Sequence, residues 1–348
     1  MIDKMLSAGI VPDFLIRKGI KSLLKQRLSN ENQNLFKNNE SKRKQLIEEL
    51  KSSPVAIETD KANDQHYMVP PKFFEKCLGN RLKYSCCHWD QATNLNEAEN
   101  EMLALTVNRA QIKDGDKILE LGHGWGAITL YMAEKFPNSK ITAVSNSKFQ
   151  GEFIIDQAKM NGFSNIEIIT ADMATFDTLK TFDRVISIEM FEHMRNYKSL
   201  LANINRWLND NGTLFVHVFV HKELTYKFDV VDETDWMSKY FFSGGIMPSE
   251  HLFYYFNQDL LVREHWRVNG VHYSKTAKAW LENMDTHKQI IMDLFTKHYP
   301  SGEATKWFNY WRIFFMSCEE LWDYKNGEEW FVSHYLFEKQ KINESRIK

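Results

Sequence analysis

Residues 120–126 read Glu-Leu-Gly-His-Gly-Trp-Gly, and this stretch decides the fold of the chain. It closes an apolar segment, 117–121, and opens a helical pattern that runs to about Phe136. Three alternating glycines allow a tight turn and let a ligand approach the backbone closely. The alternative is an ordinary strand-to-helix turn without a ligand, which does not require glycine at every second position. We therefore predict a nucleoside- or phosphate-binding turn between a first strand and its helix.

The following sequence repeats this alternation of short apolar strands and amphipathic helices. The first four strands are each followed by a helix, which is typical of a doubly wound parallel sheet. Asn211-Gly212 is expected to turn the chain into a fifth strand, and two late strands follow an aromatic-rich segment. The expected strands are 117–121, 141–144, 166–169, 185–188, 213–220, 261–268 and 329–337.

The acidic residues near the glycine turn distinguish between two nucleotide cofactors. A dinucleotide site needs an acidic residue about 20 positions after the glycines, where this chain has Ser145-Asn146-Ser147. The acidic residue is instead Glu120, directly before the glycines, in the pattern acidic-x-Gly-x-Gly-x-Gly of methyltransferases. Asp172 closes the third strand, where it suits a hydrogen bond to an adenine amino group. We predict S-adenosylmethionine rather than NAD.

Three titratable residues follow the fourth strand, at the edge of the sheet where ligands gather. If a helical turn begins at Glu189, then Glu189, Glu192 and His193 lie on one face of it. A carboxylate beside an imidazole raises its basicity and suits a general base. The alternative is a helix start with acidic residues favoured by the helix dipole. We favour a catalytic site because the group lies at the expected mouth of the cofactor cleft.

Composition excludes several classes of function. The 348 residues carry a formal net charge of −2, which predicts no nucleic-acid partner. The four cysteines, Cys77, Cys86, Cys87 and Cys318, have neither disulfide-framework nor zinc spacing, so we expect no metal and a reducing, cytoplasmic location. No run of 18 apolar residues is present, so we expect no membrane span.

The two flanks of the sheet region differ from it in pattern. Residues 1–64 are expected to form a helical extension, in which basic and apolar residues alternate at helical spacing over 17–28. This stripe suits either a membrane surface or docking on the protein's own core, and we favour docking. Residues 41–52 predict a solvated charged helix. Residues 65–348 are expected to form the catalytic domain, with an aromatic-rich cap inserted at about 221–310.

Several of these stretches together resemble the cyclopropane-fatty-acid synthase superfamily, and within it the plant coclaurine N-methyltransferases. The likeness is carried by residues 84–87, 110–115, 120–126, 188–197, 309–312 and 326–330. It implies that S-adenosylmethionine is surrounded by residues of the glycine turn and of the following strand ends. It also implies that Glu189, Glu192 and His193 face the substrate amine. The expected cofactor residues are Tyr84, Ser85, Glu120, Gly122, Gly124, Asn146, Gln150, Asp172, Met173 and Ile188.

The chain is also similar to the lipid cyclopropane synthases, in which a bound bicarbonate ion acts as the base. That resemblance implies a bicarbonate site formed by Cys86, Glu192, His217 and Tyr273. Glu189, by contrast, resembles the N-methyltransferases, since the lipid enzymes have glycine there. Cys318 falls where the superfamily has a cysteine proposed as catalytic, and a buried helix cysteine is the alternative.

These observations predict an α/β protein with a Rossmann-like class I methyltransferase sheet of seven strands, an N-terminal helical extension and an aromatic-rich cap. We expect S-adenosylmethionine-dependent N-methylation of a small amine that bears an aromatic ring. The first alternative is methylene transfer to an unsaturated phospholipid at a membrane surface, with bicarbonate as the base. The second is a non-catalytic S-adenosylmethionine-binding protein. The interpretation also allows a homodimer.

Overall fold

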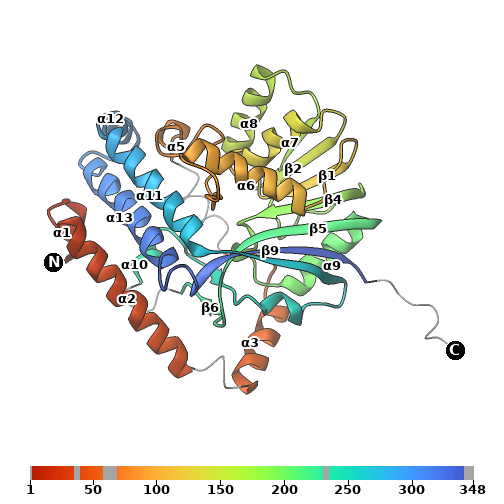
Figure 1. The fold of residues 1–348 in the computed structure, drawn as a ribbon, viewed down its shortest axis with the longest axis horizontal. Helices are drawn as coiled ribbons and strands as arrows, with labels where there is room; N and C mark the ends of the chain where they lie inside the picture. Colours follow the sequence, from red (N-terminus) through yellow and green to blue (C-terminus); the bar gives the residue numbers. More distant parts are fainter. Residues whose placement is uncertain (1, 35–39, 58–68, 230–234, 341–348) are drawn as a thin grey trace.

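The computed structural model describes residues 2–34, 40–57, 69–229 and 235–340. Its centre is a seven-stranded sheet of order β3-β2-β1-β4-β5-β9-β8, which confirms the predicted fold class (Figure 1). The first five of these strands are parallel, and β9 is antiparallel to both β5 and β8. The strands are β1 Lys117–Leu121, β2 Lys140–Ser145, β3 Ile166–Thr170, β4 Phe182–Ile188, β5 Leu208–His221, β8 Leu260–Val268 and β9 Trp330–Lys339.

Four helices accompany the parallel strands: α6 Leu95–Arg109, α7 Ala127–Lys135, α8 Lys148–Met160 and α9 Tyr197–Trp207. The central strands read as nearly continuous apolar runs because helices cover both faces of the sheet. The prediction of a turn at Asn211-Gly212 is wrong in one detail. Strand β5 already begins at Leu208, which pairs with Phe182, and the next pair is Arg184 with Thr213. Residues 209–212 therefore form an irregularity within the strand.

The predicted cap region contains elements of two kinds. Short elements follow β5: β6 Tyr226–Lys227, α10 Trp236–Tyr240, β7 Ile246–Met247 and a 3-10 turn at Leu252–Tyr255. Strand β8 then returns to the sheet, so the 221–310 segment is not purely an insertion. Three helices follow it and gather at one end of the sheet (Figure 1): α11 Gly270–Thr286, α12 Lys288–His298 and α13 Ala304–Trp322. Their aromatic side chains, including Trp280 and Trp311, are buried in one large apolar cluster.

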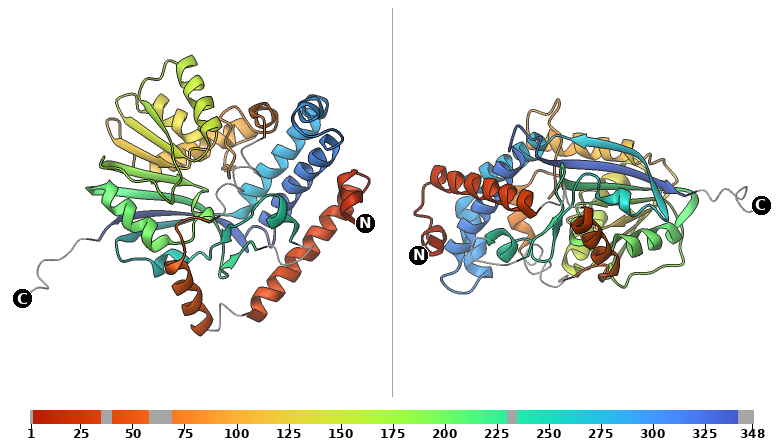
Figure 2. Two further views of the ribbon diagram at one scale, coloured as in Figure 1. Left: turned by 180° about the vertical axis from the view of Figure 1, so that it is seen from behind. Right: turned by 90° about the horizontal axis from the view of Figure 1, so that it is seen from below.

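The N-terminal helices pack on the body of the protein. They are α1 Ile2–Ser7, α2 Asp13–Asn34 and α3 Glu40–Ser52, followed by α5 Pro71–Cys77. Helix α2 lies along the outer side of α13 in both views of Figure 2. Arg17 donates to Glu319 and Glu320 of α13 at 2.7 and 2.8 Å, and Ile20 packs against the apolar cluster. The basic-apolar stripe therefore docks on the protein's own core, as favoured above.

Helix α3 differs from its prediction as a solvated charged helix. Ile47 and Leu50 are buried, and the helix contacts α9. A mostly polar helix can bury the few apolar residues on one side when another helix packs against it. The apolar residues of α3 are too few for the sequence pattern to predict this contact. The boundary expected between residues 64 and 65 lies outside the described residues. No helix among the described residues is long and apolar enough to cross a bilayer.

Candidate active site

The glycine turn after β1 has the backbone geometry that its sequence predicts. Gly122, Gly124 and Gly126 have φ angles of 85°, 48° and 83°, which lie in the left-handed region. A Cβ atom at Gly126 would lie 2.7 Å from Ile154, and one at Gly122 would lie 3.0 Å from Met190. A Cβ atom at Gly124 would meet no protein atom within 4 Å. Gly122 and Gly126 thus allow close packing, whereas Gly124 borders open space.

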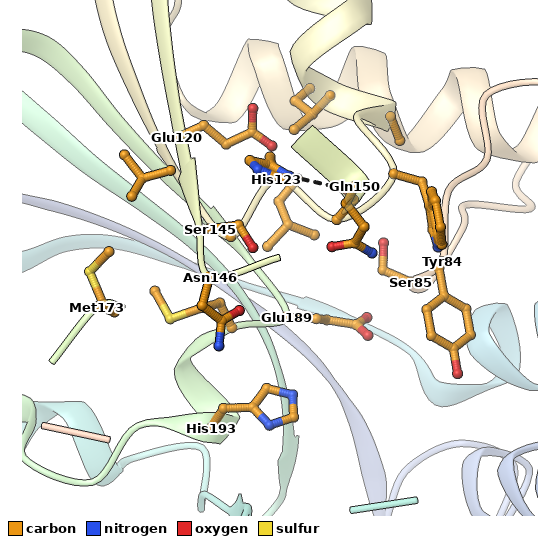
Figure 3. A pocket seen from close by; sticks show the side chains of 18 of the residues that line it. Tyr84, Ser85, Glu120, His123, Ser145, Asn146, Gln150, Met173, Glu189 and His193 are labelled. Carbon is orange, nitrogen blue, oxygen red and sulfur yellow. Dashed lines mark hydrogen bonds between the residues drawn. The ribbon is translucent and has the colours of Figure 1, made fainter. Parts of the chain in front are cut away.

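That space is a cavity at the carboxyl ends of β1, β2, β3 and β4, which we call the cofactor cavity (Figure 3). Parallel sheets bind ligands at this edge, because the loops that follow successive strands meet there. All ten residues predicted to bind the cofactor line it: Tyr84, Ser85, Glu120, Gly122, Gly124, Asn146, Gln150, Asp172, Met173 and Ile188. Glu189 and His193 of the predicted base also line it.

The polar groups in the wall of the cofactor cavity fit a ligand with its own donors and acceptors. Within the described part of the chain, neither side-chain amide atom of the buried Gln150 has a hydrogen-bond partner, and neither does Nε2 of His123. In native proteins, nearly all buried polar atoms have a hydrogen-bond partner, so these unpaired atoms are available to a bound ligand. Glu120 accepts a hydrogen bond from Thr129 Oγ1 at 2.6 Å, and burial raises its pKa to about 8. The cavity therefore suits a polar cofactor such as S-adenosylmethionine.

A second cavity adjoins the first beneath the cap helices, and we call it the cap pocket. Its wall is mostly aromatic, with residues from β5, α11 and α13 and from the segment between β6 and β7. Tyr84, Glu189 and His193 line both cavities and so stand at their junction. The remaining residues of the wall are Phe219, Phe228, Met237, Phe242, Met247, Tyr273, Trp280, Phe314, Cys318, Leu321 and Trp322.

The prediction of a helical turn that starts at Glu189 is wrong. Glu189 has a φ angle of 46°, and only Phe191–His193 form a short 3-10 helix. The backbone N–H of Glu189 still donates to the carbonyl of His217 at 2.8 Å, so the chain remains paired with β5 at this residue. A left-handed residue that is not glycine is uncommon and is often found at functional sites. Here the side chain of Glu189 lines the cofactor cavity (Figure 3), and it also lines the cap pocket.

Three groups of the chain contact the carboxylate of Glu189. Oε1 accepts from the backbone N–H of Cys86 at 2.9 Å and lies 3.2 Å from Nε2 of His217. Oε2 accepts from the hydroxyl of Tyr273 at 2.6 Å. Burial raises the pKa of Glu189, and the nearby ammonium of Lys83 and the Cys86 and Tyr273 donors oppose this rise. Burial thus makes this carboxylate more basic, while its donors favour its charged form.

Glu192 is placed differently from its prediction as a residue that faces the substrate. It is fully buried and lines neither cavity, and its Oε1 accepts from the backbone N–H of Phe219 at 3.0 Å. Its Oε2 has no partner among the described residues. Burial and the neighbouring Glu189 raise the pKa of Glu192 well above its usual value. Of this carboxyl pair, Glu189 is the better suited to hold the negative charge, because Cys86 and Tyr273 both donate to it, whereas only the backbone of Phe219 donates to Glu192.

His193 is the second candidate base. Burial lowers its pKa to about 4, so its imidazole is neutral at physiological pH and can accept a proton. The ring lies 4.7 Å from that of Phe242 between centroids, and the residue lines both cavities. Glu189 and His193 therefore remain together at the junction although the helical turn that predicted this is absent.

The residues predicted to hold bicarbonate do not surround an open position. Cys86, His217 and Tyr273 do converge, but on the carboxylate of Glu189. The fourth residue, Glu192, instead binds the backbone of Phe219. These residues thus do not fit a bicarbonate ion, because a carboxylate of the chain already accepts their hydrogen bonds.

The structure does not favour the predicted catalytic role of Cys318, and it adds one residue, Lys83, that the sequence prediction did not include. Cys318 lines the cap pocket, but burial and then Glu189 raise the pKa of its thiol, which does not favour a catalytic thiolate. Lys83 was not among the residues predicted from the sequence to form the site. It is buried beside the predicted Tyr84 and Ser85, and its Nζ donates to Ser85 Oγ and, at 2.7 Å, to the carbonyl of Cys86. Its place next to a cofactor motif is the only signal in the sequence, since a lysine usually indicates surface.

The sheet order, the left-handed glycine turn and the cavity at the strand ends together define a class I S-adenosylmethionine-dependent methyltransferase. Residues 56–328 match the family model described as mycolic acid cyclopropane synthetase, and the chain belongs to this family. The family resemblance seen in the sequence is thereby confirmed.

Individual proteins and solved structures are similar to this chain over most of its length. The chain is 41% identical to (S)-coclaurine N-methyltransferase of Thalictrum flavum subsp. glaucum over 97% of this chain and 95% of that protein. It is similar to a crystal structure of coclaurine N-methyltransferase bound to N-methylheliamine and SAH, with a TM-score of 0.92, 37% identity, and coverage of 97% of this chain and 99% of that one. The cyclopropane synthase MmaA2 of Mycobacterium tuberculosis shares the fold at a TM-score of 0.69 and 18% identity, over 83% of this chain and all of that one.

Proposed function

We propose that this methyltransferase transfers the methyl group of S-adenosylmethionine to the nitrogen of a small amine that carries an aromatic ring. The observation that carries the proposal is the position of Glu189 and His193 at the junction of the cofactor cavity and the cap pocket. A methyl group delivered from one cavity and an amine held in the other would meet beside these two bases.

The chemistry requires an amine with a free lone pair. The sulfonium of the cofactor supplies a methyl group on an excellent leaving group, so the protein has to position the amine and remove its proton. The nitrogen–carbon bond forms as the carbon–sulfur bond breaks, and the proton of the amine passes to Oε1 or Oε2 of Glu189 or to the imidazole of His193. We assign Glu189 as the principal base because it lines both cavities, whereas Glu192 lines neither.

The aromatic wall of the cap pocket supports the proposal that the substrate amine carries an aromatic ring. Phe242, Trp280 and Trp322 are among the aromatic side chains that form it. Aromatic faces attract both flat apolar rings and ammonium groups through stacking and cation–π interactions. The carboxylate of Glu189 adds the only charge of this wall within the described residues. The names of the relatives agree, since coclaurine, pavine and tetrahydroprotoberberine N-methyltransferases each cover at least 85% of this chain.

Labelled S-adenosylmethionine tests the proposal directly. The protein is incubated with coclaurine and a panel of aromatic and aliphatic amines, and in parallel with vesicles of unsaturated phospholipid, with and without bicarbonate. We expect methyl transfer to aromatic amines, in the absence of vesicles and without a bicarbonate requirement. Turnover only on vesicles would establish the lipid alternative, and cofactor binding without any turnover would establish a non-catalytic protein.

We place this activity in the cytoplasm. The proposal is supported by the cysteines Cys77, Cys86, Cys87 and Cys318, all of which are free thiols in the structure. A reducing compartment preserves such thiols. Fractionation of cells that produce the protein with a small epitope tag would test the location.

A further inference from the structure

A continuous chain of hydrogen bonds leads from Glu189 through the sheet to the far end of helix α6. Oε1 of Glu189 lies 3.2 Å from Nε2 of His217, and Nδ1 of His217 lies 2.9 Å from Nε2 of His334. Nδ1 of His334 lies 2.8 Å from a guanidinium nitrogen of Arg109. His217 and His334 are paired directly across β5 and β9, and both are fully buried. Neither His334 nor Arg109 lines the two cavities.

The arginine at the end of this chain decides the direction of every hydrogen bond in it. A guanidinium group only donates, whereas a neutral imidazole has one donor and one acceptor nitrogen. Nδ1 of His334 must therefore accept from Arg109, which leaves the proton of His334 on Nε2. That N–H donates to Nδ1 of His217, so the proton of His217 is on Nε2 and faces Glu189. Burial lowers the pKa of both histidines well below the usual value, which keeps them neutral.

We propose that Arg109 is a positioning residue for the base: through His334 it fixes the tautomer of His217, so that an N–H always faces Oε1 of Glu189. The inference rests on the proposed role of Glu189 as the base. Arg109 is itself held in place, since it ends α6 and its guanidinium lies 5.1 Å from the ring centre of Trp266. Burial lowers its pKa to about 10, which still leaves it charged at neutral pH.

The same hydrogen-bond directions show that His217, His334 and Arg109 orient the carboxylate of Glu189 but cannot conduct its proton away. Nε2 of His217 already bears a hydrogen, so it cannot accept the proton that Glu189 takes from the substrate. Arg109 has no acceptor at the other end. Without Arg109 both histidines could reverse, and a lone pair of His217 would then face Glu189. That arrangement favours the protonated carboxyl and so raises the pH at which the base becomes active.

Other charged and titratable groups act on the same carboxylate and belong in any account of its pH dependence. Those that face Glu189 are Lys83, Cys86, Glu192, His193, His217, Tyr273 and Cys318. Those that act on the two histidines besides Arg109 are Lys83 and, for His334, His88. None of these groups is removed in the Arg109 and His334 variants. Arg109→Met also removes the charge of Arg109, which acts on both histidines, whereas His334→Leu keeps that charge.

The direct test is the tautomeric state of the histidines, measured by nitrogen-15 NMR of the full chain labelled at histidine, with signals assigned from His334→Gln. In the wild type, the signals of His217 and His334 should show Nε2 protonated and Nδ1 unprotonated. In Arg109→Met we expect a mixture of tautomers. Arg184→Met is the control, because Arg184 is also partly buried but donates to the backbone carbonyls of Gln111 and Asp183. Wild-type tautomers in Arg109→Met would overturn the inference.

Kinetics of methyl transfer supply a second, independent readout. Arg109→Met should lower kcat about tenfold near neutral pH and shift the acid limb of the pH profile upward, with little change in KM for S-adenosylmethionine. His334→Gln should restore most of the rate relative to His334→Leu, because an amide can accept from Arg109 and donate to His217 at once. Equal rates for these two variants would contradict the inference. If the tautomers change but no amine is methylated, the proposed function fails, and what stands is only that Arg109 fixes the tautomers of His334 and His217.

Discussion

The cofactor cavity and the cap pocket meet at Glu189 and His193 but are built in different ways. The cofactor cavity consists largely of residues that come directly after β1, β2, β3 and β4, such as Gly122, Asn146 and Asp172. The wall of the cap pocket joins β5 to helices α11 and α13, which lie far along the chain. The first site is a property of local turns at one sheet edge, and the second is a property of helix packing. Their variants should therefore fail in different ways.

The largest expected effect is on the cofactor cavity. Gly124→Val should reduce the affinity for S-adenosylmethionine by about 10³-fold, equivalent to ~4 kcal/mol, because the new side chain enters the space that Gly124 borders. Gly162→Val is the matched control. Gly162 also has a left-handed φ, of 72°, and open space at its Cβ position, but it lines neither cavity. Calorimetry should find normal affinity in the control, and equal affinity in both variants would contradict the assignment of the cavity.

The second effect separates the two buried carboxyls at the junction. Glu189→Gln should lower kcat by about 10²–10⁴-fold, the usual contribution of a positioned base, while cofactor affinity is retained. Glu192→Gln should be mild, because Glu192 lines neither cavity and an amide oxygen can still accept from Phe219. Single-turnover methyl transfer to an amine measures both. A larger loss in Glu192→Gln would reverse our assignment of the base.

The pH profile sharpens the same assignment. The pKa of Glu189 is raised above its usual value, so the wild-type rate should fall as the pH is lowered toward that raised pKa and the carboxylate is protonated. His193 has a pKa of about 4 and stays neutral over most of this range, so it does not set the limb. The part of the acid limb that Glu189 sets should be absent from the residual activity of Glu189→Gln, which should keep only the limb due to protonation of the substrate amine.

A smaller effect concerns the thermal stability of the folded protein, to which Glu120 in the wall of the cofactor cavity contributes in a pH-dependent way. Burial raises the pKa of Glu120 to about 8 in the folded protein. A carboxyl with a raised pKa stabilises the fold fully below its unfolded pKa and loses that contribution as the pH rises through its folded pKa. Glu120→Gln stays neutral, so without cofactor its Tm should exceed that of the wild type by an amount that grows between about pH 5 and about pH 8. Thermal unfolding across this range measures it, and a constant difference would argue against the buried charge.

The smallest effect is expected in the wall of the cap pocket. Cys318→Ala should change kcat by no more than about twofold, since it removes no hydrogen bond that holds Glu189 or His193. Cys77→Ala is the control for a buried cysteine that lines neither cavity. Steady-state rates with an aromatic amine test both. A loss comparable to that of Glu189→Gln would restore a catalytic role for the Cys318 thiol.

The comparison also explains which residues the sequence pattern places together and which it does not. Every residue predicted to bind the cofactor lines the cofactor cavity, because strand ends and glycine turns are visible as local patterns. The helical turn at Glu189 was wrong because the backbone of this residue is still paired with β5, a long-range contact that spacing does not show. Glu192 was misplaced for the same reason. Spacing assigned three titratable residues to one face, whereas the chain turns Glu189 towards the cavities and Glu192 into the core.

The succession of strands and helices in the first half, the glycine turn, the cofactor class and the family were predictable from the sequence, since each depends on residues that are close along the chain. The position of the Glu189 carboxylate depends instead on tertiary contacts, because Cys86, His217 and Tyr273 converge on it from three separate elements. The tertiary structure also places Arg109 and His334 behind the base. Burial and hydrogen bonds set the charge of a side chain, and both arise from contacts between distant parts of the chain.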